Sequence, residues 1–161
     1  MASNLEYGTM IPGSVHQRDN CTPEKYCYND ITGNCQLGAA YYQWDELMQY
    51  EETEEIQGLC PPGWHIPTDA DWNQLFSLYI NNAFAASPLL YSGFSGFNAK
   101  LTGTNYLNNT WNFNAFATFF WSSAPHGITK AWAHGMNDID HSVSYYPSLR
   151  TNAFSVRCLK D

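Results

Sequence analysis

The sequence predicts a single α+β domain, and three observations support this fold class. Two stretches in the first half of the chain carry apolar residues at helical spacing, and the C-terminal part alternates short strand signals with turns. The 161 residues, 44% apolar and 16% aromatic, are enough for one core. No repeat or linker divides the chain, so we expect one domain over residues 1–161.

Residues 1–38 are rich in turns and have little periodicity, which predicts an irregular N-terminal arm. Within this arm, Cys27 and Cys35 flank the segment YNDITGN. A segment so rich in turn residues folds back on itself, so a local disulfide between these cysteines is expected.

Residues 39–50 come next and read AAYYQWDELMQY. Trp44, Leu47 and Met48 recur at spacings of three and four, which predicts a short helix with these side chains on one face. The acidic segment EETEE at residues 51–55 predicts a solvated loop rather than a calcium site.

A second helix is predicted after Thr68. Asp71 stands three residues after Thr68, which is the spacing of a capping box. The apolar stripe that follows comprises Trp72, Leu75, Phe76, Tyr79 and Ile80. Residues 87–114 lack helical spacing and predict long loops with short strands, and ATFFWSS, KAWAHGM, HSVSYY and AFSVRCL then predict a late antiparallel sheet.

Cys60 and Cys158 would together close nearly the whole domain. The loop-entropy model gives a disulfide across such a loop about 4–5 kcal/mol of stabilisation. Cys21 is left over. Disulfides at Cys27–Cys35 and Cys60–Cys158 would indicate an oxidising compartment, and the alternative is that all five cysteines are reduced and buried.

The charge balance argues against two classes of partner. Fifteen acidic and seven basic residues give a net charge of −8, which disfavours nucleic acid and anionic membranes, because both require clustered Lys and Arg. No apolar run of about 18 residues predicts a membrane span, and the N-terminus lacks the pattern of a signal peptide.

The motifs of several enzyme classes are missing. The sequence has no nucleophile elbow, phosphate loop or HExxH helix, and no cysteine spacing typical of zinc, so we expect no metal or other cofactor. His126, His134 and His141, with Asp138 among them, fit polar side chains on a binding face better than a catalytic cluster. His65 and Asp69 are expected to have structural roles beside the capped helix.

Four blocks carry a family resemblance: YCYNDITGNCQLGAAYYQWDELM, GLCPPGWHIPTDADWNQL, FWSS followed by AW, and the closing FSVRCLKD. Together they resemble the Fibrobacter succinogenes major paralogous domain, which occurs in surface proteins of Bacteroidetes. The resemblance implies a C-type-lectin-like fold with two helices, small antiparallel sheets and long loops. It also implies the same two disulfides and no catalytic residue. The calcium-dependent sugar-binding motifs of true C-type lectins are absent.

The sequence departs from the family pattern between Trp132 and Phe154, where Asn, Tyr and Ser residues are expected, and we take residues 125–153 as the candidate variable segment. The scaffold positions of this segment match the family pattern and the other positions differ from it. This distribution resembles the variable proteins of diversity-generating retroelements, and ordinary sequence drift is the alternative. We therefore predict a non-catalytic ligand-binding module on a cell surface or, alternatively, a virion surface, with a protein or glycan ligand on another cell. The predicted ligand face comprises His126, Trp132, His134, Met136, Asp138, His141, Tyr145, Tyr146 and Arg150.

Two other function classes remain open at this point. The first is a structural or adhesin-tip domain of a surface fibre. The second is an enzyme, either a hydrolase that uses the histidines or a relative of the formylglycine-generating enzymes, which need reactive cysteines. A free-thiol count discriminates, because one thiol favours the binding module and three or more favour catalysis.

Overall fold

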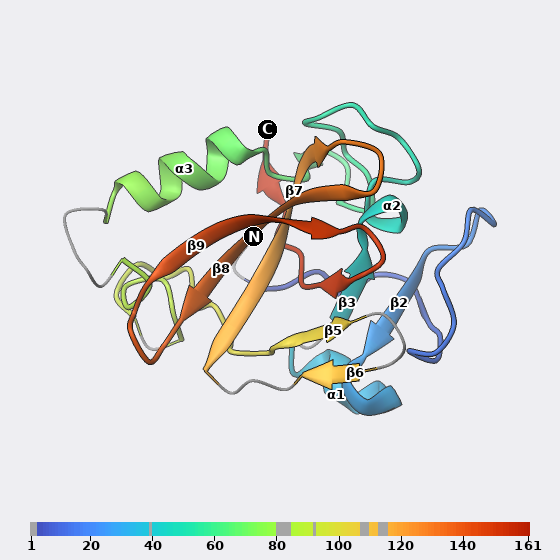
Figure 1. Cartoon of the computed structure of the whole chain (residues 1–161), viewed down its shortest axis with the longest axis horizontal. Coiled ribbons are helices and arrows are strands. Elements are labelled where there is room, and N and C mark those ends of the chain that lie inside the picture. The colour runs from blue at the N-terminus through green and yellow to red at the C-terminus, as the bar shows by residue number, and fades with distance from the viewer. Residues whose placement is uncertain (1–2, 39, 80–84, 92, 107–109, 113–115) are drawn as a thin grey trace.

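The larger sheet is built around β3 (Ala40–Gln43), whose four side chains are all buried. The computed structural model describes residues 3–38, 40–79, 85–91, 93–106, 110–112 and 116–161 (Figure 1). In the order β1-β2-β3-β10-β5-β6, β1 and β2 are parallel and the other neighbours are antiparallel. The flanking strands are β1 (Thr9–Met10), β2 (Glu24–Cys27), β10 (Ala153–Phe154), β5 (Thr104–Tyr106) and β6 (Thr110–Asn112).

The helix predicted over residues 39–50 is wrong in its first half. β3 occupies residues 40–43, and only Trp44–Leu47 form a helix, α2. Aromatic residues such as Tyr41 and Tyr42 favour strands, and pairing with β2 and β10 on both sides decides their conformation. Trp44, Leu47 and Met48 are buried together in the core, as the spacing predicted.

The arm of residues 1–38 contains more regular structure than its sequence suggests. Besides β1 and β2, it holds the 3-10 helix η1 (Tyr28–Asp30) and the short helix α1 (Thr32–Gln36), neither of which was predicted. The disulfide Cys27–Cys35 joins the end of β2 to α1. Hydrogen bonds from Gln17 and Gln43 to one another tie the arm to β3.

A second sheet consists of three antiparallel strands: β7 (Ala117–His126), β8 (Lys130–Asn137) and β9 (Val143–Leu149). These strands confirm three of the four segments of the late antiparallel sheet that the sequence predicts, whereas the fourth, AFSVRCL, contributes β10 to the larger sheet instead. β7 also meets the larger sheet through the bridge Phe120↔Ser155. Figure 1 shows the three strands lying across the larger sheet.

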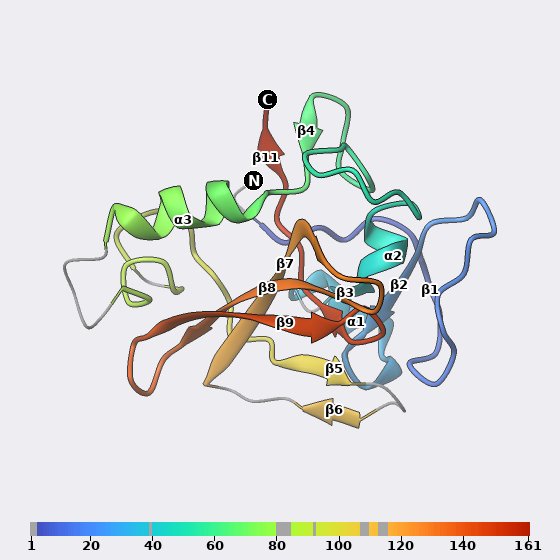
Figure 2. The same cartoon turned by 45° about the horizontal axis from the view of Figure 1, so that its top comes forward.

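The helix α3 (Asp69–Ser77) has the predicted capping box. Asp71 N donates to Thr68 Oγ1, and Thr68 N donates to the Asp71 carboxylate. Trp72 and Phe76 are buried against Phe120 of β7 and Met136 of β8. The helix therefore packs on one face of the three-stranded sheet, as Figure 2 shows.

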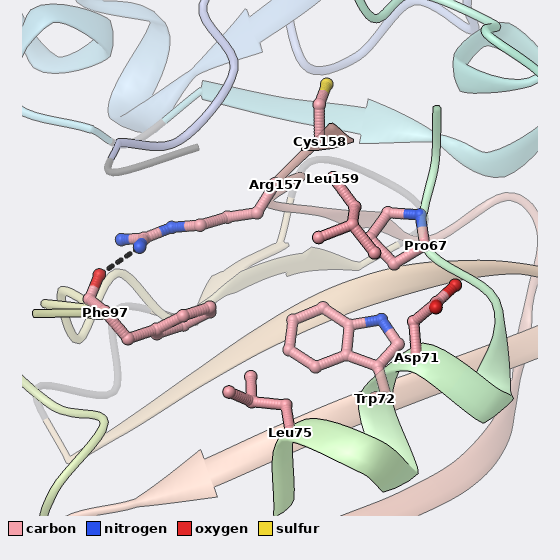
Figure 3. A pocket seen from close by; sticks show the side chains of 8 residues that line it. All are labelled: Pro67, Asp71, Trp72, Leu75, Phe97, Arg157, Cys158 and Leu159. Atoms are coloured by element: carbon pink, nitrogen blue, oxygen red, sulfur yellow. Dashed lines mark hydrogen bonds between the residues drawn. The ribbon is translucent and has the colours of Figure 1, made fainter. Parts of the chain in front are cut away.

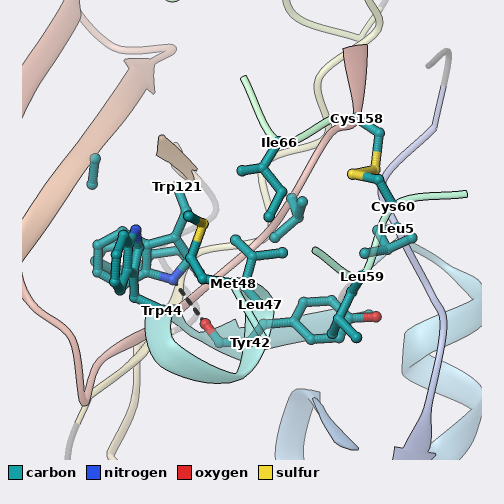
Figure 4. Packing of buried hydrophobic residues seen from close by; sticks show 14 of the residues in the cluster. Leu5, Tyr42, Trp44, Leu47, Met48, Leu59, Cys60, Ile66, Trp121 and Cys158 are labelled. Carbon is teal, nitrogen blue, oxygen red and sulfur yellow. Dashed lines mark hydrogen bonds between the residues drawn. A yellow bond between two sulfur atoms is a disulfide. The ribbon is translucent and has the colours of Figure 1, made fainter. Parts of the chain in front are cut away.

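The main core lies between the two sheets and beneath α2. Trp121 Nε1 donates to the carbonyl of Tyr42 at 2.8 Å (Figure 4), and the Trp121 and Phe154 rings lie 4.4 Å apart between centroids. The disulfide Cys60–Cys158 closes this core and joins positions 98 residues apart. It lies near the two-stranded sheet of β4 (Trp64–His65) and β11 (Leu159–Lys160).

Both predicted disulfides are thus present, and Cys21 is free and exposed. Disulfides of this kind are typical of proteins from oxidising compartments. Among the described residues, no helix is long and apolar enough to cross a membrane.

Candidate ligand-binding face

The outer face of the three-stranded sheet carries a row of aromatic side chains. Trp132 and His134 alternate with alanines along β8, so they point to one face, and Tyr145 is the partner of His134 on β9 and shares that face. The Trp132 and Tyr145 rings lie 5.6 Å apart between centroids, and the His126 ring meets Trp132 edge-on at 4.8 Å. We name His126, Trp132 and Tyr145 the aromatic row.

The aromatic row is open to solvent. Tyr145 is 66% exposed, His126 is exposed and Trp132 is half-buried. All three side chains stand on hydrogen-bonded strands, so their positions are set by the sheet rather than by a loop. The row therefore presents aromatic surface whose position is fixed by the sheet.

The helix α3 covers the rest of this outer face. His134 and Met136 are each 1% exposed, so the prediction that they lie on an exposed ligand face is corrected. Trp72 of α3 stacks on His134 with ring centroids 5.3 Å apart, and Asp69 Oδ1 accepts a hydrogen bond from His134 Nε2 at 2.9 Å. His134 therefore attaches the helix to the sheet and lies beneath the surface next to the aromatic row.

The prediction that Arg150 lies on an exposed ligand face is also corrected, because this side chain is only 7% exposed. Its Nη1 donates to Glu52 at 2.7 Å and to Asp45 at 3.3 Å, and the guanidinium lies 4.2 Å from the Trp44 ring. Burial raises the pKa of the Asp45 carboxyl, although the Arg150 charge lowers it. Further bonds from Arg150 reach the carbonyls of residues 127 and 130, so this side chain holds the β7–β8 turn against α2.

Tyr146 points to the opposite face of the sheet. Its partner on β8 is Ala133, and its ring meets Phe119 edge-on with centroids 5.8 Å apart. Asp138 and His141 lie in the turn between β8 and β9, where His141 Nδ1 is 3.7 Å from Asp138 Oδ1. This turn follows Met136 at the far end of β8, so the pair is not part of the aromatic row.

The structure does not bring His126, His134 and His141 together, because His134 is buried against α3 and His141 lies in the turn after β8. Within the described ranges, no group of three or more His, Cys, Asp or Glu residues could hold a metal ion. His65 lies instead near the C-terminus, where Nδ1 is 2.7 Å from Asp161 Oδ1 and Nε2 is 3.7 Å from Asp71. This position agrees with the structural role expected for His65.

Sequence reasoning gave Asp69 a structural role beside the capped helix and did not find its contact with His134. The capping box uses Asp71, which leaves the Asp69 carboxylate to reach across to β8. No local signal indicates this contact, because the two residues are 65 positions apart.

Fold and site together define a small, disulfide-bonded α+β domain with an exposed aromatic row beside a capped helix. The chain belongs to the Fibrobacter succinogenes major domain family, whose model matches residues 1–160. No curated protein and no solved structure matches the chain.

Proposed function

We propose that this chain is a non-catalytic ligand-binding module that uses the aromatic row as its contact surface. The observation that carries the proposal is the contact of Trp132 with both His126 and Tyr145 on an open sheet face. Tyrosine and tryptophan give large contact areas at a low cost in side-chain entropy, and histidine adds a directional hydrogen bond.

The ligand is a protein or glycan presented by another cell. An aromatic row suits both, because rings can stack on the apolar face of a sugar or on an apolar or cationic side chain. The net charge of −8 disfavours strongly acidic ligands.

The cysteines support a binding role over a thiol-dependent one. Four of the five are in disulfides, and Cys21 alone is free. A single exposed thiol does not provide the reactive cysteine pair expected of a relative of the formylglycine-generating enzymes. The disulfides also support our proposal that the domain acts outside the cell, on a cell or virion surface.

We also propose that the fold is C-type-lectin-like and that residues 125–153 are a variable segment. The support for variability is that His126 and Tyr145 are exposed, Trp132 is half-buried, and their ring contacts are with one another apart from the stacking of Tyr145 on His134. Its test is genomic: a near-copy of the DNA for this segment, differing at adenines and next to a reverse-transcriptase gene, is expected. If the complete genome lacks such a copy, ordinary sequence drift explains how this segment differs from the family pattern.

The binding test compares Trp132→Ala/Tyr145→Ala with Tyr91→Ala, which removes a similarly exposed aromatic side chain (68%) away from the row. Each protein is applied to a glycan array and to intact bacterial cells, with and without protease treatment of the cells. We expect the native chain and Tyr91→Ala to bind alike and the double variant to bind at least about tenfold more weakly, because central aromatic contacts dominate such interfaces.

Circular dichroism of each variant establishes that it is folded. If the folded double variant binds as tightly as the native chain, the aromatic row is not the contact surface. Loss of cell binding after protease treatment identifies a protein ligand, whereas binding to the array identifies a glycan. A native chain that binds neither probe contradicts the proposed function.

A further inference from the structure

The outer edge of β9 is the free edge of the three-stranded sheet. β9 is the last strand in the order β7-β8-β9 among the described residues, and Figure 2 shows it on the outside of this sheet. An edge strand presents a row of backbone N–H and C=O groups with which another chain can pair, and native proteins commonly protect such edges with charged side chains. β9 has the sequence VSYYPSL, so its edge lacks charged residues.

The register of β8 and β9 fixes which residues direct their backbone groups to this edge. Asn137 N donates to the carbonyl of Ser142 at one end of the strand pair, and Arg150 N donates to the carbonyl of Thr129 at the other. Both contacts continue the register of the two strands. Bonded and non-bonded pairs alternate in an antiparallel ladder, so the even-numbered residues from 142 to 150 bond to β8. The odd-numbered residues of β9 therefore face the outer edge.

Pro147 agrees with this assignment and limits the usable length of the edge. Proline lacks an N–H, so a sheet tolerates it where that position faces outward. Pro147 thus interrupts the row of outward donors, and beyond it the carbonyl of Leu149 already accepts from Asn152 N. Complete outward N–H and C=O pairs remain at Val143 and Tyr145, whose backbone groups have no hydrogen bond to another described residue.

The helix α3 packs on the face of the sheet rather than on this edge. Its side chains contact His134 and Met136 of β8, the strand next to β9. Elsewhere α3 borders a small pocket between Trp72 and Leu159, shown in Figure 3, and no residue of β9 lines that pocket. The side chains of Ser144 and Tyr145 are exposed, so this edge lies at the surface beside the aromatic row.

The spacing of the free backbone groups selects a peptide as their partner. Val143 and Tyr145 are two residues apart, which corresponds to about 6.8 Å along an antiparallel strand. A second extended backbone presents its own N–H and C=O groups at the same interval, so it satisfies both pairs at once. A glycan does not carry N–H and C=O groups side by side at this interval.

Tyr145 adds a preference for certain peptide side chains. The peptide residue opposite Tyr145 would share its face of the sheet and lie next to its ring, where aromatic and β-branched side chains pair favourably. The net charge of −8 disfavours acidic peptides.

We propose that the outer edge of β9 binds an extended peptide segment of a protein ligand as a fourth strand of the sheet, bonded to the backbones of Val143 and Tyr145. The aromatic row would then contact side chains of the same peptide. This inference rests on the proposed function and narrows its ligand from a protein or glycan to a protein.

The first test uses an array of random octapeptides as the probe, and the array peptide that binds the native chain most tightly is synthesised for work in solution. Amide exchange in ¹H–¹⁵N spectra should slow at least about tenfold at Val143 and Tyr145 when this peptide is added. The amides of Ser144 and Tyr146 already bond to β8, so their exchange should change little.

Methylation of single backbone nitrogens in the same peptide tests the pairing without altering the protein. Methylation at the residues that face β9 should weaken binding at least about tenfold, because it removes a hydrogen bond and adds a clash. Methylation at the residues between them should have little effect, since their N–H groups face away from β9.

Val143→Pro tests the edge from the side of the protein, with Leu149→Pro as the matched control. Val143→Pro removes an outward N–H but no bond to β8, so it should weaken peptide binding at least about tenfold. Leu149→Pro changes an outward position beyond Pro147 and should leave binding unchanged. Circular dichroism establishes that each variant is folded, and the methylated peptides decide the matter if Val143→Pro is not.

The proposal is overturned if no array peptide binds, if methylation is tolerated at every nitrogen, or if folded Val143→Pro binds as the native chain does. Protection of Val143 and Tyr145 that rises with protein concentration in the absence of peptide would assign the edge to a second copy of the chain and also overturn it. Cell binding that is lost in Trp132→Ala/Tyr145→Ala but kept in Val143→Pro would leave the proposed function standing without this inference. Cell binding that is kept in both variants would contradict both.

Discussion

Asp69, in the first turn of α3, accepts a 2.9 Å hydrogen bond from Nε2 of His134, which lies on β8. The contact joins elements that are far apart in sequence and fixes the helix over one half of the outer sheet face. The other half keeps the aromatic row exposed. The same bond thus contributes to stability and limits the extent of the candidate site.

Replacement of Asp69 by alanine should destabilise the protein. Asp69→Ala leaves the buried Nε2–H of His134 without its acceptor, and we expect the free energy of unfolding to fall by about 1–3 kcal/mol. Urea denaturation measures the change. Asp69→Asn keeps an acceptor oxygen, so its free energy of unfolding should fall by less. Asp19→Ala changes an exposed site, so its free energy of unfolding should hardly change. Equal stability of Asp69→Ala and the native chain would show that the bond contributes nothing.

Gly135 on β8 should not tolerate a methyl group. A Cβ atom there would lie 2.8 Å from Phe119 Cε1 and 2.8 Å from Ser144 Oγ. Gly135→Ala should therefore lower the free energy of unfolding by about 1–3 kcal/mol through overpacking. Gly33→Ala in α1 is the control, since a Cβ there meets nothing within 4 Å and alanine favours helix. Thermal unfolding compares the two variants, and a Gly135→Ala protein at least as stable as Gly33→Ala would contradict the packing argument.

The two disulfides should contribute unequally to stability. Cys60–Cys158 closes a loop over a separation of 98 residues, and Cys27–Cys35 closes one over a separation of 8. The loop-entropy model gives about 4–5 kcal/mol for the first and about 2–3 kcal/mol for the second. Urea denaturation of Cys60→Ala/Cys158→Ala and of Cys27→Ala/Cys35→Ala measures both. Equal losses in the two double variants would argue against an entropic origin.

Buried tyrosines should make the protein sensitive to alkali. Burial raises the pKa values of Tyr26, Tyr41 and Tyr42 above their ordinary value of 10.0. Each hydroxyl donates to a backbone carbonyl, and a phenolate cannot. The folded state therefore keeps protons that the unfolded chain releases above pH 10. The three tyrosines therefore contribute their full stabilisation below pH 10. Above pH 10, the free energy of unfolding falls by about 1.4 kcal/mol per pH unit for each tyrosine.

Absorbance at 295 nm and circular dichroism, followed together from pH 9 to 13, test this expectation. Part of the tyrosinate signal should appear only as the folded structure is lost. Tyr42→Phe should reduce the steepness of the loss, because it removes one of the titrating groups. Ionisation of all the tyrosines near pH 10 with the fold intact would show the prediction to be wrong.

Local signals predicted the parts of the fold that depend on neighbours in sequence. Thr68 and Asp71 carry the capping box within four residues, and the turn between Cys27 and Cys35 brings its own ends together. The strand character of residues 40–43 was missed, because Tyr41 and Tyr42 take their conformation from β2 and β10 rather than from helical spacing.

The candidate site could be predicted only in part, for a related reason. Alternation along β8 puts Trp132, His134 and Met136 on one face, so the sequence gives all three the same expected exposure. Only the position of α3 distinguishes them, and that position depends on contacts from residues 69, 72 and 76. Arg150 was misplaced similarly, because its acidic partners lie about a hundred positions earlier in the chain.

The area of the outer sheet face that α3 covers, here called its footprint, should tolerate substitutions less well than the area that it leaves uncovered. The rings at positions 126, 132 and 145 pack on one another, and only Tyr145 also stacks on His134, so substitutions there should disturb the helix less. Positions 134 and 136 lie inside the footprint, where a change of volume would displace Trp72 and Phe76. The packing of α3 therefore constrains part of this sheet face, while the positions that the helix does not cover are free to vary.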